Sequence, residues 1–464
     1  MIDPVNIYHA LPYQMRSAAA SLYGFHLRSW RYGPETEHLI EEALDRDRWS
    51  LSQWHDWEDE RLSYILHRAA MKVPYYKDYW QKRRRHGDRA SWELLINWPI
   101  LKKQTLRENP LALIADDCNV SLMYRDRTGG TTGTPLSIYL SRPSMRQWYA
   151  LFEARIRRWH GVSINEHWAI LGGQLVVPVN QSKPPFWVHN LGLNQLYLSS
   201  QHVSMHNAQW FAKVLNRFSP THMIVYPSSA VVLAYAALEM KLVLPPINVI
   251  FSNAETLLPS HRDVIAKAFG CSVRNTYGMG EYVCGASECQ EGLMHLWPEV
   301  GKIEIFDDII DHPLPKRSPG RIILTGLLNP DMPLIRYDVG DRGELKSDKG
   351  LCICQRSLPI LFDIQGRSND MLITPDGRYV FWLNPVFYEL PIIEAQIVQT
   401  KVDDVQINYV PALGYDNDMD QIIIKRMLER MGNIHIRLHR VDHIPRAANG
   451  KFRAVISNLK QRNL

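Results

Sequence analysis

The sequence predicts an α/β protein with a large N-terminal domain of mostly parallel sheets and helices, followed by a small α+β domain. Two observations lead to this prediction. From Leu122 onward, short β-rich apolar runs alternate with longer amphipathic stretches, which is typical of a parallel sheet covered by helices. The 464 residues also exceed one ordinary compact domain, so we expect two or three units.

The elements follow from the local pattern. Residues 1–110 are rich in Trp, Tyr and Arg and read as mainly helical, with one helix over 58–71 that ends at Val73-Pro74. We then expect strands at 168–171, 223–226, 247–251 and 320–325, and helices at 146–159, 208–217, 230–241 and 260–269. A boundary near Gly366 divides the chain into domains 1–365 and 366–464, the second with a helix at 421–432 and a strand at 434–440.

Composition excludes several classes of protein. Apolar residues make up 45% and charged residues 22%, which is the balance of a soluble globular protein. The net charge of +5 is small and gives no indication of nucleic-acid binding, and the basic run 82–89 is interpreted as a solvated turn in preference to a polyanion contact. No signal peptide is recognisable, and charged residues and prolines interrupt the most apolar segment, 231–251. We therefore expect a cytoplasmic protein without a membrane or nucleic-acid partner.

The strongest local motif is the run from Arg127 to Pro135, Arg-Thr-Gly-Gly-Thr-Thr-Gly-Thr-Pro. Its glycines allow the backbone to approach phosphate oxygens, and its hydroxyl and N–H groups are neutral donors to them. No lysine follows the last glycine, so the run is not the phosphate loop of P-loop ATPases and kinases. The alternative interpretation is a flexible Gly/Thr turn.

Four further segments have weaker signals when each is taken alone. In 275–281, Glu281 follows a glycine turn at the end of a strand and has the ligand chemistry for Mg²⁺ on nucleotide phosphates. In 334–341, a carboxylate after a strand suits a ribose, although a hairpin turn fits as well. The other two are 366–371, at the domain boundary, and 444–453, where Lys451 follows Asn-Gly and would ordinarily be a solvated turn lysine.

Together the five segments resemble the acyl-adenylate-forming enzymes, whose motifs occur in this order and at roughly this spacing. Within that superfamily the chain resembles the phenylacetate–CoA ligase branch, and most of all its members associated with capsular polysaccharide biosynthesis. Signatures of that branch are also recognised at 73–76, 98–103, 226–229 and 358–359, so the resemblance covers nearly the whole chain. It implies a large adenylate-forming domain with a mobile C-terminal lid, and a homodimer by analogy.

The resemblance implies a role for each matching residue. The predicted nucleotide contacts are Thr128, Gly129, Gly130, Thr131, Thr132, Gly133, Thr134, Ser252, Asn253, Ala254, Glu255, Tyr277, Gly278, Met279, Asp341 and Arg367. Glu281 would bind Mg²⁺, and Lys451 would reach the carboxylate and the α-phosphate, so Lys451, Glu281 and Arg367 are the candidate catalytic residues. The candidate lining of the acyl pocket is Gly172, Gly173, Tyr226, Pro227 and Ser228. The alternative for Tyr226 is an ordinary core aromatic, which is the more frequent role of such a residue.

Two departures from the family pattern concern the lid. The predicted hinge is Asn369, where the family usually has Asp, and the adjacent Asp370 is a candidate substitute. The segment after Asp370 differs from the loop that lines the thiol tunnel of phenylacetate–CoA ligases. CoA is therefore one acceptor among several, and a carrier-protein thiol, an amine or a sugar hydroxyl stays open.

Four residues have ligand chemistry for a structural Zn²⁺. Cys289 and His295 are six residues apart, and Cys352 and Cys354 are two apart, so three thiolates and one imidazole would complete a tetrahedral site. Cys284 is an alternate ligand. The competing interpretation is four ordinary core residues, with cysteine packing as a small hydrophobe.

These residues lead to one predicted function and two alternatives. The prediction is ATP- and Mg²⁺-dependent activation of a carboxylic acid, aryl or arylalkyl by resemblance, to an acyl-adenylate, followed by transfer to a thiol such as that of CoA. One alternative is an amide- or ester-forming synthetase in polysaccharide or natural-product assembly. The other is a non-catalytic homologue that binds a nucleotide, against which the retained Glu281, Asp341, Arg367 and Lys451 argue.

Overall fold

The computed structural model describes residues 4–127, 136–307, 310–315, 317–345, 352–367, 372–376, 379–380, 383–387, 389–447 and 451–459. The chain forms two compact units. Unit 1 comprises Met1–Tyr23, Asn165–Val273 and Gln365–Leu464, and unit 2 comprises Gly24–Ile164 and Arg274–Ile364. Each unit thus combines segments from distant parts of the sequence. The division into domains 1–365 and 366–464 follows chain order, and it remains a prediction together with the movement of the second domain.

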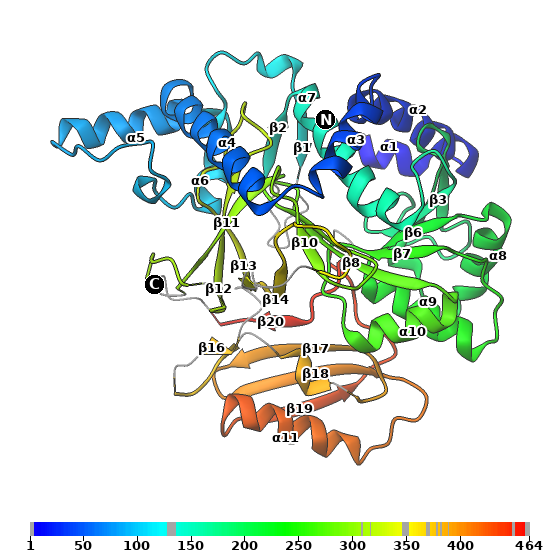
Figure 1. Cartoon of the computed structure of the whole chain (residues 1–464). Helices are drawn as coiled ribbons and strands as arrows, with labels where there is room; N and C mark the ends of the chain where they lie inside the picture. Colours follow the sequence, from blue (N-terminus) through cyan, green and yellow to red (C-terminus); the bar gives the residue numbers. More distant parts are fainter. Residues whose placement is uncertain are drawn as a thin grey trace. The chain divides into compact units, whose positions relative to one another are not determined.

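Unit 1 contains strands in the order β7-β6-β3-β5-β4, of which β7, β6 and β3 are labelled in Figure 1. The first four are parallel, and only the edge strand β4 is antiparallel. Their bounds are β3 Trp168–Gly172, β4 Trp187–Asn190, β5 Gln195–Ser199, β6 His222–Val225 and β7 Val249–Ser252. The predicted alternation of apolar strands and helices therefore forms a mostly parallel sheet, and the predicted α/β class is confirmed.

Helices pack on the two faces of this sheet because successive side chains of a strand point in opposite directions. Ala169 and Leu171 face a core built with α8 (Ala208–Phe218), α9 (Pro227–Glu239) and α10 (Pro259–Phe269). Ile170, between them, packs in a separate cluster with Ala20. Ala20 lies in α2 (Tyr13–Arg31), which follows α1 (Pro4–Ala10).

The C-terminal segment of unit 1 has its own four-stranded sheet, in the order β19-β18-β17-β20. Helix α11 (Met419–Met431) lies along one face of it (Figure 1) and buries Ile423 and Met427 there. The bounds are β17 Ile392–Lys401, β18 Asp404–Pro411, β19 His435–Arg440 and β20 Val455–Ser457, with a short pair β15 Leu372–Ile373 and β16 Tyr379–Val380. Ile393 of β17 joins the core around α9, so this segment packs on the parallel-sheet segment of the same unit.

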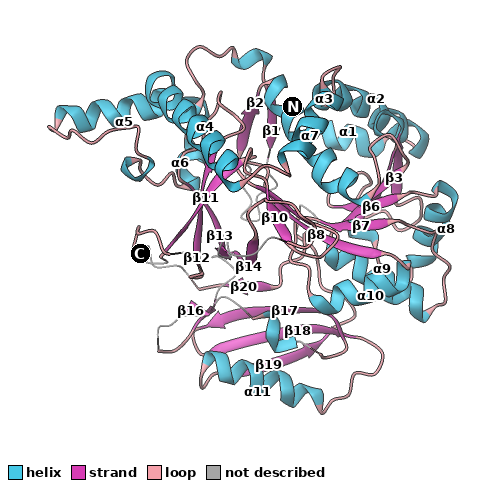
Figure 2. Cartoon of the chain, viewed as in Figure 1, coloured by secondary structure: helices cyan, strands magenta, loops and turns pink. Residues whose placement is uncertain are grey.

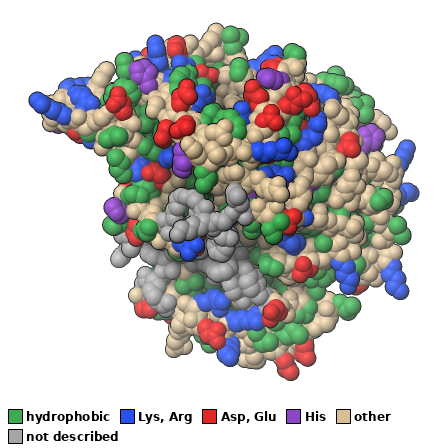
Figure 3. Space-filling view, in the orientation of Figure 1, with side chains coloured by type: hydrophobic (Ala, Val, Ile, Leu, Met, Phe, Trp, Pro, Cys, Tyr) green, Lys and Arg blue, Asp and Glu red, His purple; other side chains and the backbone are tan. Residues whose placement is uncertain are grey.

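Unit 2 begins with helices, and Figure 2 shows helix and loop up to strand β1. The bounds are α3 Thr36–Arg46, α4 Leu51–Lys72, α5 Pro74–Arg85, α6 Lys103–Glu108 and α7 Arg142–Phe152. The predicted stop at Val73-Pro74 separates α4 from α5, because proline lacks an N–H and suits the first position of a new helix. The basic run begins in the last turn of α5, where blue side chains gather at one end of the surface in Figure 3.

The strands of unit 2 include a sheet in the order β11-β12-β13-β14 and an antiparallel set β8-β9-β10. The bounds are β1 Tyr124–Arg127, β2 Ser137–Leu140, β8 Ser272–Gly278, β9 Gly285–Glu288, β10 Met294–Leu296, β11 Gly301–Phe306, β12 Gly320–Gly326, β13 Tyr337–Leu345 and β14 Leu361–Arg367. The expectation that Asp341 follows a strand is wrong. Asp341 lies inside β13, where the pairing with β12 shifts register and Gly340 has a φ of +74°.

A buried charge cluster stabilises the core of unit 2. Arg155 lies in a π-helical segment, Glu153–Arg157, that continues α7. Its guanidinium donates to Asp47 Oδ1 at 2.8 Å and to Glu299 at 2.7 and 2.8 Å.

No helix among the described residues is both long and apolar enough to cross a bilayer.

Candidate functional site

Several predicted residues of unit 1 meet at one edge of its sheet. Gly172 ends β3, Tyr226 follows β6, and Ser252 ends β7. The parallel register keeps these ends together, since Tyr226 N–H donates to Leu171 O and Asn253 N–H to Val225 O, both at 2.9 Å. The carboxyl edge of a parallel sheet is where α/β proteins commonly bind ligands.

Gly172 leaves part of this edge without a side chain. A Cβ atom on Gly172 would lie 2.6 Å from the Tyr197 hydroxyl, so only glycine fits beside that ring. The hydroxyl of Tyr197 accepts a hydrogen bond from Gln174 N–H at 3.1 Å. Burial, with a smaller contribution from the Glu255 carboxylate, raises the pKa of Tyr226 to about 12, so this phenol stays protonated at neutral pH.

Glu255 connects this edge with the segment that contains Lys451. Its Oε2 accepts a hydrogen bond from Ser228 N–H at 3.0 Å, at the start of α9. Its Oε1 accepts one from Phe452 N–H at 2.6 Å. Ala254 has a φ of +68°, a left-handed conformation that non-glycine residues rarely adopt.

In unit 2 the structure brings the two other predicted nucleotide segments together. The Tyr277 hydroxyl, near the end of β8, donates to Asp341 Oδ2 of β13 at 2.9 Å. Gly278 is the last residue of β8, and Met279 follows it. The bulge in β13 thus turns the Asp341 carboxylate toward the ring of Tyr277, another predicted nucleotide contact.

Glu281 lies close to the same two strands and is buried, with 6% of its surface exposed. Its Oε1 accepts a hydrogen bond from the Tyr337 hydroxyl at 2.9 Å and lies 3.3 Å from Lys103 Nζ. Burial, followed by the charge of Glu281, raises the pKa of Tyr337. One carboxylate beside nucleotide phosphates is a usual protein contribution to a Mg²⁺ site, so Glu281 fits the predicted ion.

The remaining predicted residues are only partly described. The loop Thr128–Thr134 and the hinge pair Asn369 and Asp370 lie outside the described residues. The backbone of Arg367 ends β14. Lys451 is described and half-buried, and its carbonyl accepts a hydrogen bond from Ala447 N–H at 3.0 Å.

The four predicted zinc ligands lie together in unit 2. Their ligand atoms are all within 4.8 Å of one another. Cys289 Sγ lies 3.6 Å from Cys352 Sγ, and Cys354 Sγ lies 3.4 Å from His295 Nε2. The alternate ligand Cys284 is not in this group; burial and then the Asp341 charge raise its thiol pKa to about 12.

Comparisons with known proteins agree with the predicted resemblance. Residues 372–458 match the family model of the CapK C-terminal domain. The chain is 29% identical over 467 residues to Protein CapK of Staphylococcus aureus, covering 98% of this chain and 99% of that protein. It is 31% identical over 125 residues to phenylacetate-coenzyme A ligase of Thermus thermophilus, covering 26% of this chain and 28% of that protein.

Similarity to solved structures identifies the fold. The crystal structure of 2-hydroxyisobutyryl-CoA ligase in the postadenylation state with R3-HIB-AMP has a TM-score of 0.66 and 18% identity, covering 89% of this chain and 91% of that one. The chain has the adenylate-forming fold. The structure of an anthranilate CoA ligase with anthranoyl-AMP is also similar, with a TM-score of 0.51 and 15% identity, covering 73% of this chain and 67% of that one. The predicted resemblance is confirmed.

Some residues near the predicted site in this adenylate-forming fold were missed in the sequence. Lys103 and Tyr337 contact Glu281, although both stand in segments recognised as signatures, 98–103 and 334–341. A charged or phenolic residue inside a recognised segment is the signal that points to them. Gln201 donates to Ala447 O at 3.2 Å, and nothing in the sequence indicates this contact.

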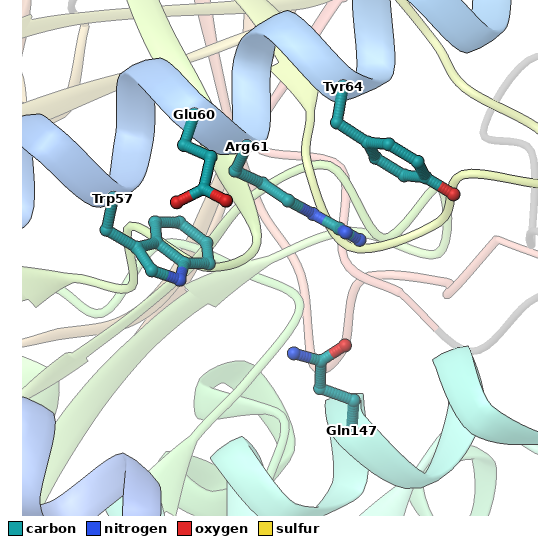
Figure 4. A pocket seen from close by; sticks show the side chains of 5 residues that line it. All are labelled: Trp57, Glu60, Arg61, Tyr64 and Gln147. Carbon is teal, nitrogen blue, oxygen red and sulfur yellow. The ribbon is translucent and has the colours of Figure 1, made fainter.

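A pocket outside the predicted set also lies in unit 2. It has a volume of about 420 Å³ and is lined by Trp57, Glu60, Arg61 and Tyr64 of α4 and by Gln147 of α7 (Figure 4). The Arg61 guanidinium donates to Leu327 O at 2.8 Å and lies 5.1 Å from the centre of the Tyr64 ring. None of the predicted nucleotide or acyl contacts is among its lining residues.

Proposed function

We propose that this chain is an ATP-dependent carboxylate ligase that forms an acyl-adenylate and releases pyrophosphate. The similarity to CapK along the full chain and the adenylate-forming fold support this proposal. Several of the similar solved structures contain an acyl-adenylate, and others contain CoA as well.

The observation that carries the proposal is the convergence of two motifs in unit 2. Tyr277 and Glu281 come from one recognised segment, and Tyr337 and Asp341 come from another about 60 residues later. The hydrogen bonds Tyr277–Asp341 and Tyr337–Glu281 join the two segments at both ends. A carboxylate suits the hydroxyls of a ribose, and a second carboxylate suits a cation on the phosphates, so the two joined segments offer groups that fit a nucleotide.

The chemistry explains why a lysine is needed as well. The substrate carboxylate must attack the α-phosphorus, and both groups are anionic. The Lys451 ammonium would bridge their oxygens and stabilise the charge in the transition state. Mg²⁺, held by Glu281, would neutralise charge on the phosphates. Asp341 would bind the ribose hydroxyls with help from Arg367, and Tyr226 with the glycines at 172 and 173 would line the acyl pocket.

Transfer of the acyl group completes the proposed reaction. CoA is the first acceptor to test, because it is the acceptor named for the similar ligases. An amine, a sugar hydroxyl or a carrier-protein thiol would attack the same activated carbonyl, break its bond to the phosphate and release AMP, which gives an amide, an ester or a thioester, respectively.

The test is release of pyrophosphate from ATP in the presence of phenylacetate, benzoate, 2-hydroxyisobutyrate, octanoate or alanine, with hydroxylamine to trap the adenylate. We expect one acid to stimulate release, and Lys451→Ala to lower that rate at least about 100-fold because the bridging cation is lost. The affinity for ATP should stay within about twofold. Unchanged pyrophosphate release in Lys451→Ala would refute the role of Lys451, and no release with any acid would refute the proposed activity.

We also propose that Cys289, His295, Cys352 and Cys354 hold a structural Zn²⁺. Thiolates about 2.3 Å from a tetrahedral zinc lie about 3.8 Å apart, close to the 3.6 Å between Cys289 and Cys352. His295 Nδ1 lies 3.2 Å from Leu358 O, which suits an N–H donor there and leaves Nε2 for the metal. Trp54, Trp159 and Leu358 pack around the cysteines and exclude water. Four protein ligands leave no open position, so the role would be structural.

Metal analysis of the purified chain tests the zinc proposal. We expect about one zinc per chain, and loss of the metal with a lower melting temperature in Cys289→Ser. Cys118→Ser is the matched control, since Cys118 is also in unit 2 but outside the group. A folded chain that contains no metal would contradict the proposal.

A further inference from the structure

The peptide group that joins Lys451 to Phe452 forms hydrogen bonds through both its carbonyl oxygen and its N–H. The Lys451 carbonyl accepts the hydrogen bond from Ala447 N–H at 3.0 Å. The amide of the same peptide group, Phe452 N–H, donates to Glu255 Oε1 at 2.6 Å. The position of the Lys451 main chain is therefore set partly by a carboxylate from a distant part of unit 1.

Glu255 is itself fixed at the start of α9. Its second oxygen, Oε2, accepts from Ser228 N–H, which is the first N–H of the helix because Pro227 has none. The N-terminus of a helix stabilises a negative charge. The left-handed φ of Ala254 is an uncommon conformation, and it directs the chain so that the next side chain reaches both donors.

Further contacts involve three described residues near Lys451, namely Arg446, Ala447 and Phe452. Arg446 forms a buried ion pair with Glu394 of β17, and its guanidinium lies 5.0 Å from the centre of the Phe452 ring. Gln201 Nε2 donates to Ala447 O. Arg446, Ala447 and Phe452 thus have partners on the parallel-sheet segment or on β17, all within unit 1.

We propose that Glu255 is a positioning residue that holds the Lys451 segment at the N-terminus of α9 for the adenylation step. The proposal rests on the proposed function, because it assigns Glu255 an effect on the step that uses Lys451. In this role the carboxylate contacts a peptide group and not the reacting atoms. Removing it should therefore slow adenylation without weakening the binding of ATP, whereas loss of the direct nucleotide contact that the resemblance implies for Glu255 would weaken binding.

The kinetic test compares Glu255→Ala and Glu255→Gln with the wild-type chain. We expect Glu255→Ala to lower kcat for acid-dependent pyrophosphate release about tenfold or more, with a Kd for ATP within about twofold of wild type. Glu255→Gln keeps one carbonyl oxygen as an acceptor and should recover part of the rate. Glu239→Gln, an exposed glutamate at the end of α9, is the control. Unchanged kcat, or a loss explained by weaker ATP binding, would overturn the proposal.

Hydrogen exchange of the full chain gives a readout that does not need activity. Peptides that contain Phe452 should exchange faster in Glu255→Ala than in the wild-type chain or in Glu239→Gln. Equal exchange in all three would overturn the proposal. A wild-type chain that is inactive with every acid would refute the proposed function instead, and the exchange result would still decide whether Glu255 holds this segment.

Discussion

Two buried glutamates of unit 2, Glu281 and Glu299, have opposite surroundings. Both oxygens of Glu299 accept hydrogen bonds from the Arg155 guanidinium, and Arg46 lies 3.0 Å from one of them. Glu281 has the Tyr337 hydroxyl and Lys103, and the lysine side chain is 37% exposed. Glu299 therefore has two arginines as partners, whereas the cation beside Glu281 is exposed to solvent.

The difference separates a structural charge from a candidate functional one. A buried charge is costly unless it is paired, and Arg155 meets that requirement for both Glu299 and Asp47. Among the described residues, no hydrogen bond reaches Glu281 Oε2, and the cationic partner of Oε1 is exposed to solvent, which suits a ligand that binds and leaves. Substitutions at the two sites should therefore affect different properties.

The largest expected effect is on stability, at the Glu299 cluster. Arg155→Ala leaves Asp47 and Glu299 without their shared partner, and we expect the free energy of unfolding to fall by about 3–5 kcal/mol. Urea denaturation followed by circular dichroism measures this change. Arg158→Ala is the matched control from the adjoining turn, because Arg158 is 35% exposed and its ion pairs should be worth about 1 kcal/mol or less. Equal effects of the two substitutions would contradict the comparison.

A smaller effect, on activity, is expected at Glu281. Glu281→Gln keeps an oxygen for the Tyr337 hydroxyl but removes the charge for Mg²⁺. We expect pyrophosphate release to fall about 100-fold, which is roughly 3 kcal/mol in the barrier, with a higher Mg²⁺ requirement. The free energy of unfolding should change by only about 1 kcal/mol. Glu291→Gln, which changes an exposed glutamate of the same unit, should leave both properties unchanged. A stability loss as large as that of Arg155→Ala would assign Glu281 a structural role.

Much of the fold could be predicted because its signals are local. The strand at 168–171 and the helix at 260–269 appear within one or two residues of the expected bounds, since apolar periodicity and proline positions act over short distances. The meeting of Cys289 and His295 with Cys352 and Cys354 was also expected, because only a few residue types can complete such a site.

Contacts between distant segments could not be predicted in the same way. The Asp47–Arg155–Glu299 cluster joins three segments that share no motif, and arginine and glutamate are common on any surface. The position of Asp341 inside β13 depends on how that strand pairs with β12, which a single strand does not reveal. The same reason applies to Glu255 and Phe452, which meet only after unit 1 has assembled.

The smallest expected effect is on the pH dependence of the free energy of unfolding, and it tests Glu299 alone. Burial by itself would raise the pKa of Glu299, but Arg155 and then Arg46 lower it below the usual value of 4.5. The unfolded chain therefore binds the proton more readily, so Glu299 contributes stability above about pH 4.5 that is lost as the pH falls through its folded pKa. Glu299→Gln cannot titrate, and its free energy of unfolding should fall less steeply between pH 5 and 3 than that of the wild-type chain. Glu291→Gln should follow the wild-type curve. Parallel curves for wild type and Glu299→Gln would show that Arg155 does not favour the charged form of Glu299, and the contrast with Glu281 would then rest on geometry alone.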